Sequence, residues 1–234
     1  MLVTEIWRYP IKSVGGEQLM TATVGTRGID GDRGWGIRDA ASGNHLTARR
    51  EPRLLLATAA VVGDDVVMTL PDGTETNDDA TLSSWLGADV NLERATEETS
   101  AIFENPLDWE NEGDWMSWNG PSGSFHDSGR TMVSLCGVDT ARDWDLRRFR
   151  QNIWVSGGGE VDLLDSSIRI GSARFDITKR IARCVMVTRP QPGIDRDLSV
   201  LRTISDEMDS MLGVGAMVPT PGEIAVGDEV TLSS

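Results

Sequence analysis

The strongest constraint on the fold of this 234-residue chain is a succession of short β-type runs, each closed by residues that favour turns. The first run, 2–9, carries β-branched and aromatic residues and stops at Pro10, which cannot continue a ladder of hydrogen bonds. Later runs end at groups such as Gly63-Asp64-Asp65 and Pro71-Asp72-Gly73, which supply turn chemistry. Many short strands with few helices are typical of barrels rather than of a doubly wound sheet.

This pattern predicts a mainly β fold with some α structure (α+β). Strands are predicted over 2–9, 18–24, 34–38, 54–62, 66–70, 132–135, 149–156, 168–170, 173–178 and 185–188. Short helices are predicted over 80–86 and 138–144. One segment, 197–212, has strong helical spacing of its apolar residues, and the tail 222–232 predicts a tight hairpin around Gly227-Asp228.

Residues 103–120 interrupt this pattern and divide two predicted domains, 1–102 and 121–234. The segment carries Trp109, Trp115 and Trp118 among acidic residues, without a basic residue to balance them. We interpret it as an acidic, tryptophan-rich connecting loop, since long irregular segments of compact proteins are functional loops or linkers. Two roles stay open for it: a connector whose indoles pack back on the protein, or a lid or docking surface for a partner.

The charge balance narrows the range of partners. The chain has 22 basic and 37 acidic residues, which give a formal net charge of −15. Such a chain repels nucleic acids and anionic membranes at long range, so we expect neither as a partner and predict a small-molecule substrate. The sequence has no apolar stretch long enough to cross a bilayer and no N-terminal signal pattern. Its two cysteines fit a reducing compartment, and we predict a soluble, cytoplasmic protein.

The two cysteines differ in their neighbours. Cys184 follows Arg180-Ile181-Ala182-Arg183, and guanidinium groups near a sulfur favour the thiolate, which attacks electrophiles and binds soft metals. Cys136 lies in an apolar run without such neighbours, which predicts a small buried side chain. Cys184 is therefore the candidate nucleophile or metal ligand.

A second group of candidates is cationic and lies at predicted turns. It comprises Lys12 beside Ser13, then Arg33, Arg49 and the run Arg147-Arg148-Phe149-Arg150. In a chain of this negative charge such cations need anions, and a small ligand such as a phosphorylated cofactor would satisfy several of them together. The alternative is equally physical, because acidic side chains of the protein itself could pair with them.

Taken in order, these motifs resemble a known family. Tyr9-Pro10-Ile11-Lys12-Ser13, Asp32-Arg33-Gly34-Trp35, Leu46-Thr47-Ala48-Arg49 and Glu51-Pro52-Arg53-Leu54 resemble the β-barrel N-terminal domain that accompanies MOSC domains. Phe149-Arg150-Gln151-Asn152-Ile153, Arg183-Cys184 and Gly222-Glu223-Ile224-Ala225-Val226-Gly227-Asp228 resemble the MOSC domain, named for the C-terminal part of molybdenum-cofactor sulfurases. The resemblance spans almost the whole chain and implies an N-terminal β-barrel domain packed on a MOSC-type β-barrel.

The resemblance also implies roles for individual residues. Cys184 matches the cysteine whose sulfur ligates molybdenum in the mitochondrial amidoxime-reducing components and their bacterial counterparts, and Arg183 precedes that ligand. Asp127 matches a loop beside the cofactor, and with Cys184 and Arg183 it is a candidate catalytic residue. The residues predicted to bind the molybdenum cofactor (Mo-molybdopterin) are Lys12, Ser13, Arg33, Arg49, Ser128, Arg150 and Asn152.

Three positions depart from the family pattern. Val14 stands where relatives often have Cys, Gln151 replaces the usual Pro, and Ala182 replaces a small hydroxyl residue of the reductases. None of these changes removes the predicted metal ligand. We expect Ala182 to alter the hydrogen bonding around that ligand.

From the resemblance we predict a molybdenum-dependent oxidoreductase, independent of pyridoxal phosphate, that reduces the N–O bond of N-hydroxylated compounds. The sequence shows no ferredoxin-like domain after its last predicted strand, so electrons are expected from a separate electron-transfer protein. The main alternative is a sulfur carrier or sulfurtransferase, or C–S chemistry, in which Cys184 acts as a persulfide or thiolate without permanent molybdenum. A third is a cofactor carrier without catalysis.

Overall fold

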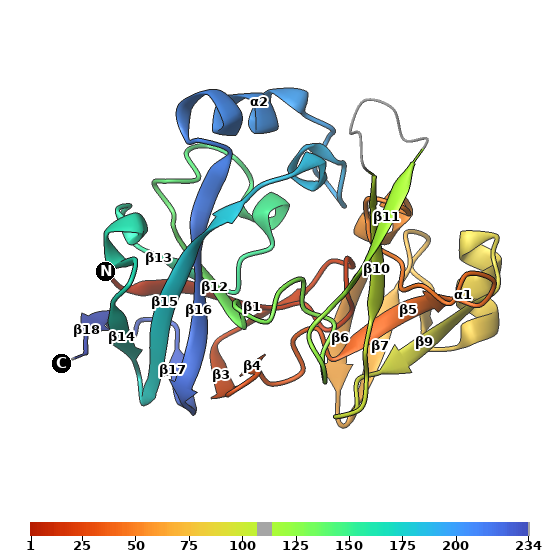
Figure 1. Ribbon diagram of the computed structural model, residues 1–234, viewed down its shortest axis with the longest axis horizontal. Helices are drawn as coiled ribbons and strands as arrows, with labels where there is room; N and C mark the ends of the chain where they lie inside the picture. The colour runs from red at the N-terminus through yellow and green to blue at the C-terminus, as the bar shows by residue number, and fades with distance from the viewer. Residues whose placement is uncertain (107–113, 234) are drawn as a thin grey trace. The chain divides into compact units, whose positions relative to one another are not determined.

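The structure, a computed structural model, describes residues 1–106 and 114–233 (Figure 1). Most of the described secondary structure is β-strand, with two α-helices and four short 3-10 helices, so the predicted mainly β fold is confirmed. Trp109, part of the predicted tryptophan-rich loop, lies outside the described residues. Neither of the two described α-helices has the length and apolar composition needed to cross a membrane.

The chain packs as two compact units, each with its own core. Unit 1 comprises Met1–Arg8, Glu17–Asp32 and Arg130–Ser234, and unit 2 comprises Tyr9–Gly16 and Arg33–Gly129. The first two segments of unit 1 thus pack with the C-terminal half, although the sequence boundaries assign them to the N-terminal domain. The reason is strand pairing over a long sequence distance, because β1 (Val3–Arg8) pairs with β13 (Ile153–Val155).

Unit 1 is built on an eight-stranded sheet. Its order is β18 (Thr231–Leu232), β14 (Ser167–Ile170), β15 (Ala173–Ala182), β16 (Met211–Thr220), β12 (Val133–Gly137), β13, β1 and β2 (Glu17–Leu19). Neighbouring strands run antiparallel except for β12 and β13, which are parallel. A three-stranded sheet joins β17 (Gly222–Ala225), β3 (Thr21–Gly25) and β4 (Gly28–Ile29).

Helix α2 (Leu198–Glu207), the blue helix in Figure 1, is the predicted long helix, but it is shorter than its apolar spacing predicts. It begins with Asp197 as its N-cap, where an acidic residue favours a helix start. It ends before residue 212 because Asp209 and Ser210 adopt positive φ angles, which a right-handed helix does not accommodate. The last residue of the predicted apolar series, Leu212, therefore belongs to β16.

The large sheet carries a hydrophobic cluster on each face, because successive side chains of a strand point to opposite sides. On β13, Ile153 and Val155 join the larger cluster, whereas Trp154 between them joins a second one. The second cluster also contains Val200 of α2 and Val187, which lies three residues after the candidate cysteine. Packing against this face of unit 1 therefore positions the segment that follows Cys184.

Two short predictions on this face are wrong. Residues 185–188, predicted as a strand, form the 3-10 helix η4 (Val185–Thr188). Residues 138–144, predicted as a helix, form a series of turns. Val138 and Trp144 pack against the second cluster, so burial rather than weak local preference decides the backbone there.

The tail 222–232 does not form the predicted hairpin, although the chain turns there with Gly227 at a positive φ angle. Strand β17 pairs with β3, and β18 pairs with β14, so the two arms join different sheets. The Asp228 carboxylate accepts a hydrogen bond from the Ala225 N–H at 2.8 Å across the turn. The two arms pair with strands β3 and β14 rather than with each other, because this pairing buries apolar groups, including Ile224 in the larger cluster.

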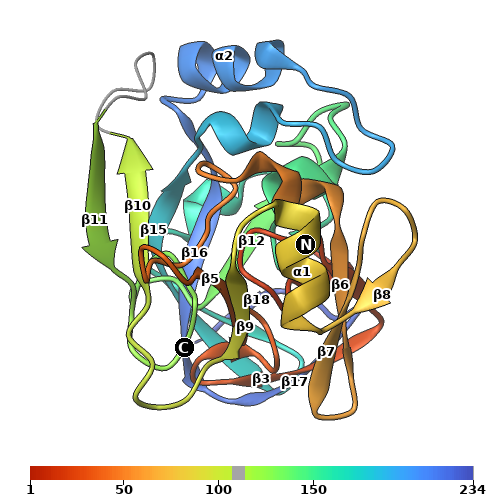
Figure 2. The ribbon, with the colours of Figure 1, turned by 90° about the vertical axis from the view of Figure 1, so that its right-hand side faces the viewer.

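Unit 2 contains three small antiparallel sheets and one α-helix. The sheets are β5 (Trp35–Asp39) with β9 (Val90–Arg94), then β6 (Thr58–Val62) with β7 (Asp65–Thr69) and β8 (Glu75–Thr76), and finally β10 (Ile102–Pro106) with β11 (Trp115–Asn119). Helix α1 (Asp79–Leu86) begins after its N-cap Asp78 and ends at Gly87 in the left-handed conformation. Its Leu82 and Leu86 pack in one core with residues of β6, β7 and β9. Figure 2 shows α1, the yellow helix, next to these strands.

One predicted strand of unit 2 begins later than the sequence suggests. Residues 54–56 belong to the 3-10 helix η1 (Pro52–Leu56), and the strand β6 starts only at Thr58. The helix is favoured by Pro52 at its start and by the Glu51 carboxylate, which accepts a hydrogen bond from the Arg53 N–H. Pro52 and Glu51 thus shift the strand start by several residues.

The described part of residues 103–120 is a hairpin rather than the predicted irregular loop. Strands β10 and β11 pair in register from Ile102–Asn119 to Pro106–Trp115. Phe103 is fully buried, and its ring centre lies 4.9 Å from that of the half-buried Trp118. The Arg50 guanidinium lies 4.3 Å from the centre of the Trp115 ring. These two indoles therefore pack on unit 2, in line with the first of the two roles considered for the segment.

Candidate functional site

The predicted phosphate-binding residues begin with two turns that the backbone of unit 2 joins. The Lys12 N–H donates to the carbonyl of Trp35 at 2.9 Å, and the Arg33 N–H donates to the carbonyl of Tyr9 at 2.9 Å. Ser13 and Arg33 both adopt positive φ angles, which are uncommon for residues other than glycine. These bonds hold segment 9–13 against the start of β5, so the two cations come from one rigid element.

Lys12 forms the closest ion pair of this region. Its side chain is almost completely buried, and its Nζ lies 2.6 Å from the Oδ1 of Asp127, whose side chain is 67% exposed. The same Nζ lies 4.7 Å from the centre of the Phe103 ring, an additional favourable contact for a cation. A buried ammonium group without a partner would be costly, so Asp127 stabilises Lys12 in this position.

Three cations act on Asp127 together. Desolvation of the Asp127 carboxyl opposes its ionisation, but the charge of Lys12, followed by those of Arg49 and Arg33, holds its pKa well below the usual range. Arg33 stacks on Tyr9 at 5.1 Å, and Arg49 donates a hydrogen bond to the Asn105 side chain in β10. The structure therefore gathers Lys12, Arg33 and Arg49 around one negative charge.

The loop that carries Asp127 is held by the turn that carries Arg33. The Phe125 N–H donates to the carbonyl of Arg33 at 2.9 Å, and the Phe125 ring lies 4.9 Å from the ring of His45. Buried His126 and half-buried Ser128 flank Asp127 in this loop. The sequence places these residues about 100 positions from Lys12 and Arg33, and the fold brings the loop to them.

His45 is a buried residue of the core rather than part of the cation group. Its Nε2 shares a hydrogen bond with the Glu93 carboxylate at 3.1 Å, and its ring packs between those of Phe103 and Phe125. Burial lowers the pKa of His45 below its ordinary value of 6.5, while the neighbouring Glu93 opposes that shift. His45 is therefore held mainly in its neutral form near neutral pH.

The candidate sulfur lies in unit 1. Cys184 is half-buried with an extended backbone, and its carbonyl accepts the Val187 N–H at 3.2 Å as η4 begins. Cys136 is fully buried, as predicted, and its thiol lies 3.4 Å from the Glu160 carboxylate. Burial, followed by the charge of Glu160, raises the pKa of the Cys136 thiol far above its ordinary value. Of the two thiols, Cys184 is the one that solvent and ligands reach.

Arg183 binds backbone carbonyls on both sides of the second cluster. Its Nε and Nη2 donate to the carbonyl of Leu212 at 3.0 and 2.8 Å, and its Nη1 donates to the carbonyl of Phe149 at 2.8 Å. Arg180 similarly donates to the carbonyl of Met208 at 3.0 Å. Arg183 thus fixes the residue before Cys184 to β16 and to the segment before Arg150. The catalytic role predicted for Arg183 stays a prediction.

Arg148 holds the other side of the cysteine segment, and sequence reasoning did not separate it from its neighbours. Only 8% of the residue is exposed. Its guanidinium donates to the carbonyls of Asp195 at 2.7 Å, Val187 at 3.4 Å and Arg189 at 3.5 Å. These contacts tie η4 and the loop after it to one charged group. In the sequence, Arg148 is one of three arginines within the run 147–150. Its burial in the structure places its guanidinium within reach of the three carbonyls.

Asn152 and Arg150 have structural positions in unit 1. The Asn152 amide accepts hydrogen bonds from the N–H and hydroxyl of Ser134 at 3.1 and 3.0 Å and donates to the carbonyl of Trp7 at 3.2 Å. These bonds align β1, β12 and β13. Arg150 adopts a left-handed conformation and ends the 3-10 helix η2 (Leu146–Phe149). Direct cofactor contacts of both residues stay predictions.

The predicted site residues therefore form two groups. Within unit 2 the structure gathers Lys12, Arg33, Arg49 and Asp127, with Ser13 and Ser128 as chain neighbours. Within unit 1, hydrogen bonds of Arg183 join the cysteine segment to the segment before Arg150. Among residues 1–106 and 114–233, no three His, Cys, Asp or Glu side chains gather as a metal-binding group.

Two family profiles match this chain. The profile of the MOSC N-terminal beta barrel domain matches residues 1–115, and the profile of the MOSC domain matches residues 130–231. The chain belongs to the MOSC domain family. MOSC domains are associated with binding of the molybdenum cofactor, so the cations of unit 2 and the accessible thiol of unit 1 lie in a protein of a cofactor-associated family.

Two of the solved structures similar to this MOSC protein come from Bacillus subtilis and Geobacillus stearothermophilus. The YUAD protein from Bacillus subtilis is 12% identical with a TM-score of 0.45, and the match covers 98% of this chain and 93% of that one. YiiM from Geobacillus stearothermophilus is 13% identical with a TM-score of 0.38, and the match covers 59% of this chain and 74% of that one. A search of curated proteins found no match.

Proposed function

We propose that this MOSC protein binds the molybdenum cofactor and reduces N-hydroxylated compounds with electrons from a separate protein. The observation that carries the proposal is the gathering of Lys12, Arg33 and Arg49 around the Asp127 carboxylate. A group of cations that stabilises one carboxylate so strongly is suited to a phosphate, which has the same sign and more acceptor oxygens. The association of MOSC domains with the molybdenum cofactor supports the choice of this cofactor.

Each unit carries side chains whose chemistry suits one part of such a cofactor. Lys12, Ser13, Arg33 and Arg49 would hold the phosphate and pterin, and Cys184 would ligate the metal through a thiolate, which suits soft metals. When bound, the cofactor would supply the two-electron redox chemistry of the proposed reduction. The protein supplies binding and orientation. Arg183 and Arg148 hold the backbone on either side of Cys184 and thereby position its sulfur.

The ionisation of Asp127 defines its part in the proposed reaction. Because the pKa of Asp127 is far below neutrality, the carboxylate carries no proton at pH 7 and is poorly matched to donate one. We therefore propose that Asp127 orients Lys12 and polar groups of the ligand as a hydrogen-bond acceptor. Proton delivery would then fall to water or to the neighbouring His126.

The test uses two cysteine variants that differ in accessibility. Protein made in a molybdenum-replete host is expected to carry close to one molybdenum per chain, and Cys184→Ala should lose it while keeping the circular dichroism spectrum. Cys136→Ala, which removes the buried thiol, should retain the metal. Wild-type protein should also reduce an amidoxime or a hydroxylamine with an artificial reductant. Less than about a tenth of an equivalent of molybdenum in the wild type, or full retention by Cys184→Ala, would contradict the assignment.

The sulfur-transfer alternative is favoured by one specific observation, namely that Cys184 is the more accessible of the two thiols. In that reaction the Cys184 thiolate would attack the outer sulfur of a persulfide donor, whose own sulfur leaves as a thiolate, and the new Cys184 persulfide would pass that outer sulfur to a nucleophilic acceptor, which regenerates the Cys184 thiolate without permanent molybdenum. Cyanide-labile sulfur measured on wild type and on Cys184→Ala distinguishes the two functions. About one labile sulfur per wild-type chain, in protein without molybdenum, would favour sulfur transfer over reduction.

A further inference from the structure

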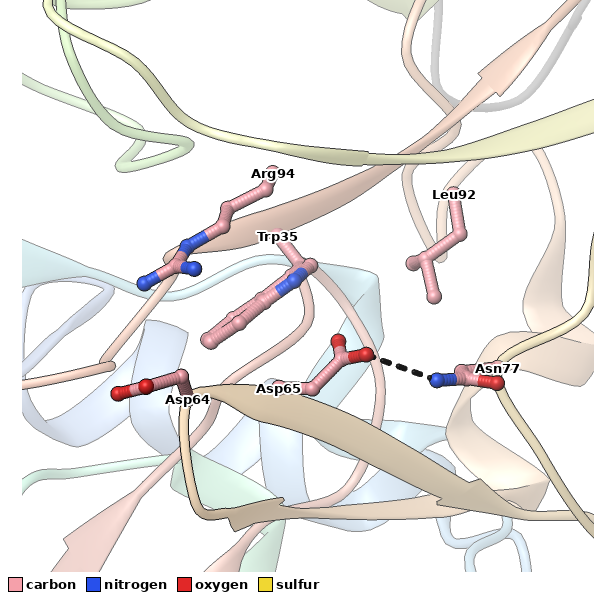
Figure 3. Close-up of a pocket in the computed structure, with 6 residues that line it drawn as sticks. All are labelled: Trp35, Asp64, Asp65, Asn77, Leu92 and Arg94. Atoms are coloured by element: carbon pink, nitrogen blue, oxygen red, sulfur yellow. Dashed lines mark hydrogen bonds between the residues drawn. The ribbon is translucent and has the colours of Figure 1, made fainter.

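Unit 2 contains a cavity of about 530 Å³ that the proposed function does not use. Six residues line it: Trp35 of β5, Leu92 and Arg94 of β9, Asp64 and Asp65 at the turn between β6 and β7, and Asn77 after β8 (Figure 3). The walls combine an indole and an isobutyl group with charges of both signs. Cavities with an apolar wall and a few convergent polar groups are the usual form of small-molecule sites.

Two of the wall charges lack partners. Within the described residues, the side chains of Asp64 and Arg94 form neither ion pairs nor hydrogen bonds, although both line the same cavity. The Arg94 guanidinium lies over the face of Trp35, 5.4 Å from the ring centre. Both side chains are exposed where they line the cavity, so water solvates their charges and a bound ligand would replace that water. A ligand with an anionic and a cationic group could form ion pairs with Arg94 and Asp64 at the same time.

The other polar groups of the cavity form a fixed wall. The Asp65 carboxylate accepts the Val66 N–H at 2.8 Å and the Asn77 side-chain amide at 3.0 Å, so both of its oxygens have partners. Asn77 is thereby oriented by Asp65. The ionic recognition thus depends on Asp64 and Arg94 alone.

The arrangement in Figure 3 defines the shape of the ligand. The Arg94 guanidinium and the Asp64 carboxylate flank one end of the Trp35 ring, whereas Leu92 and Asn77 lie toward the other end. A ligand that suits this arrangement carries an anionic and a cationic group close together at one end and an apolar or amide-bearing body at the other. We propose that the cavity binds a free α-amino acid, with its carboxylate on Arg94, its ammonium group on Asp64 and its side chain along Trp35 toward Leu92.

Nuclear magnetic resonance can test this proposal with L-leucine as the probe. The Trp35 indole N–H, identified by its loss in Trp35→Phe, reports directly on the cavity. L-leucine is expected to shift this signal saturably, with a dissociation constant of about 1 mM, because exposed ion pairs contribute little individually. L-leucinamide lacks the carboxylate and N-acetyl-L-leucine lacks the ammonium group, so each should bind about fivefold more weakly or worse.

Matched protein variants complete the test. Arg94→Gln and Asp64→Asn should each weaken L-leucine binding by about fivefold, while Asp72→Asn, at an exposed turn outside the cavity, should leave it unchanged. Inorganic phosphate, which would occupy the Lys12 and Arg33 group, should not compete with L-leucine at matched ionic strength. No saturable shift, equal shifts by the three leucine compounds, or competition by phosphate would each overturn the proposal. These outcomes are independent of the molybdenum content, which tests the proposed function.

Discussion

Arg148 gives the most direct test of how the cysteine segment is held. Replacing Arg148 with Met keeps most of the apolar stem but removes the guanidinium, which donates to the carbonyls of Asp195, Val187 and Arg189. Only the bond to Asp195 is short, at 2.7 Å, and a hydrogen bond from a charged donor contributes about 1.5–3 kcal/mol. The two longer contacts, at 3.4 and 3.5 Å, add about 0.5 kcal/mol each. We therefore expect Arg148→Met to lower the free energy of unfolding by about 3 kcal/mol.

Urea denaturation of the full chain measures this loss, and the neighbouring Arg147 provides the control. Arg147 is more exposed and pairs with Asp145 at 2.7 Å, so Arg147→Met should cost no more than about 1 kcal/mol. A second measurement follows the reaction of Cys184 with a thiol reagent under native conditions. Release of η4 should raise that rate in Arg148→Met but not in Arg147→Met. If the two variants lose equal stability and Cys184 reacts at the wild-type rate in both, the reasoning about Arg148 is refuted.

Three further predictions concern pH and backbone geometry. Asp127 should remain ionised at pH 3 in the wild type. Its contribution to stability is present above the ordinary aspartate pKa and should be lost only as the pH falls through the lower pKa of the folded protein. Titration followed by carbon-13 resonance should show a higher Asp127 pKa in Lys12→Met than in the wild type. Folding lowers the pKa of His45, so the unfolded chain binds a proton on this imidazole more tightly than the folded protein does. The contribution of neutral His45 to stability should therefore be complete above pH 6.5 and decline below it. A His45 pKa above 6.5, measured by proton resonance, would contradict this. Gly213→Ala should cost at least about 2 kcal/mol, since its Cβ would meet the Leu135 carbonyl oxygen at 2.9 Å and would clash with Nε2 of the buried Gln151. Gly193→Ala, at a similar φ with open space, should cost about half as much in thermal or urea unfolding, and equal losses would exclude the steric cause.

Local patterns in the sequence predict much of the fold because they act over a few residues. Alternation of apolar and polar side chains locates most strands, and the acidic residue at 197 marks the start of α2. The order of motifs around Lys12, Arg33 and Cys184 is also a property of the sequence alone, and it leads to the family that the profiles show. These inferences need no knowledge of which segments meet in space.

Pairing and burial were decided by the tertiary structure. The tail 222–232 carries a hairpin pattern, but its two arms pair with β3 and β14, and Ile224 is buried there in the larger cluster. The run Arg147-Arg148-Phe149-Arg150 offers three similar cations, and only the folded chain shows that Arg148 is buried beneath η4.

The candidate site shows the same division. The sequence by itself determined which residues carry suitable chemistry: a thiol preceded by arginines, and cations at turns in an acidic chain. Only the tertiary structure decided that Asp127 lies beside Lys12, that Arg183 binds carbonyls, and that a cavity beside Trp35 holds two unpaired charges. The physical reason is that charges act through space at a few ångströms, whereas the sequence specifies distance only along the chain.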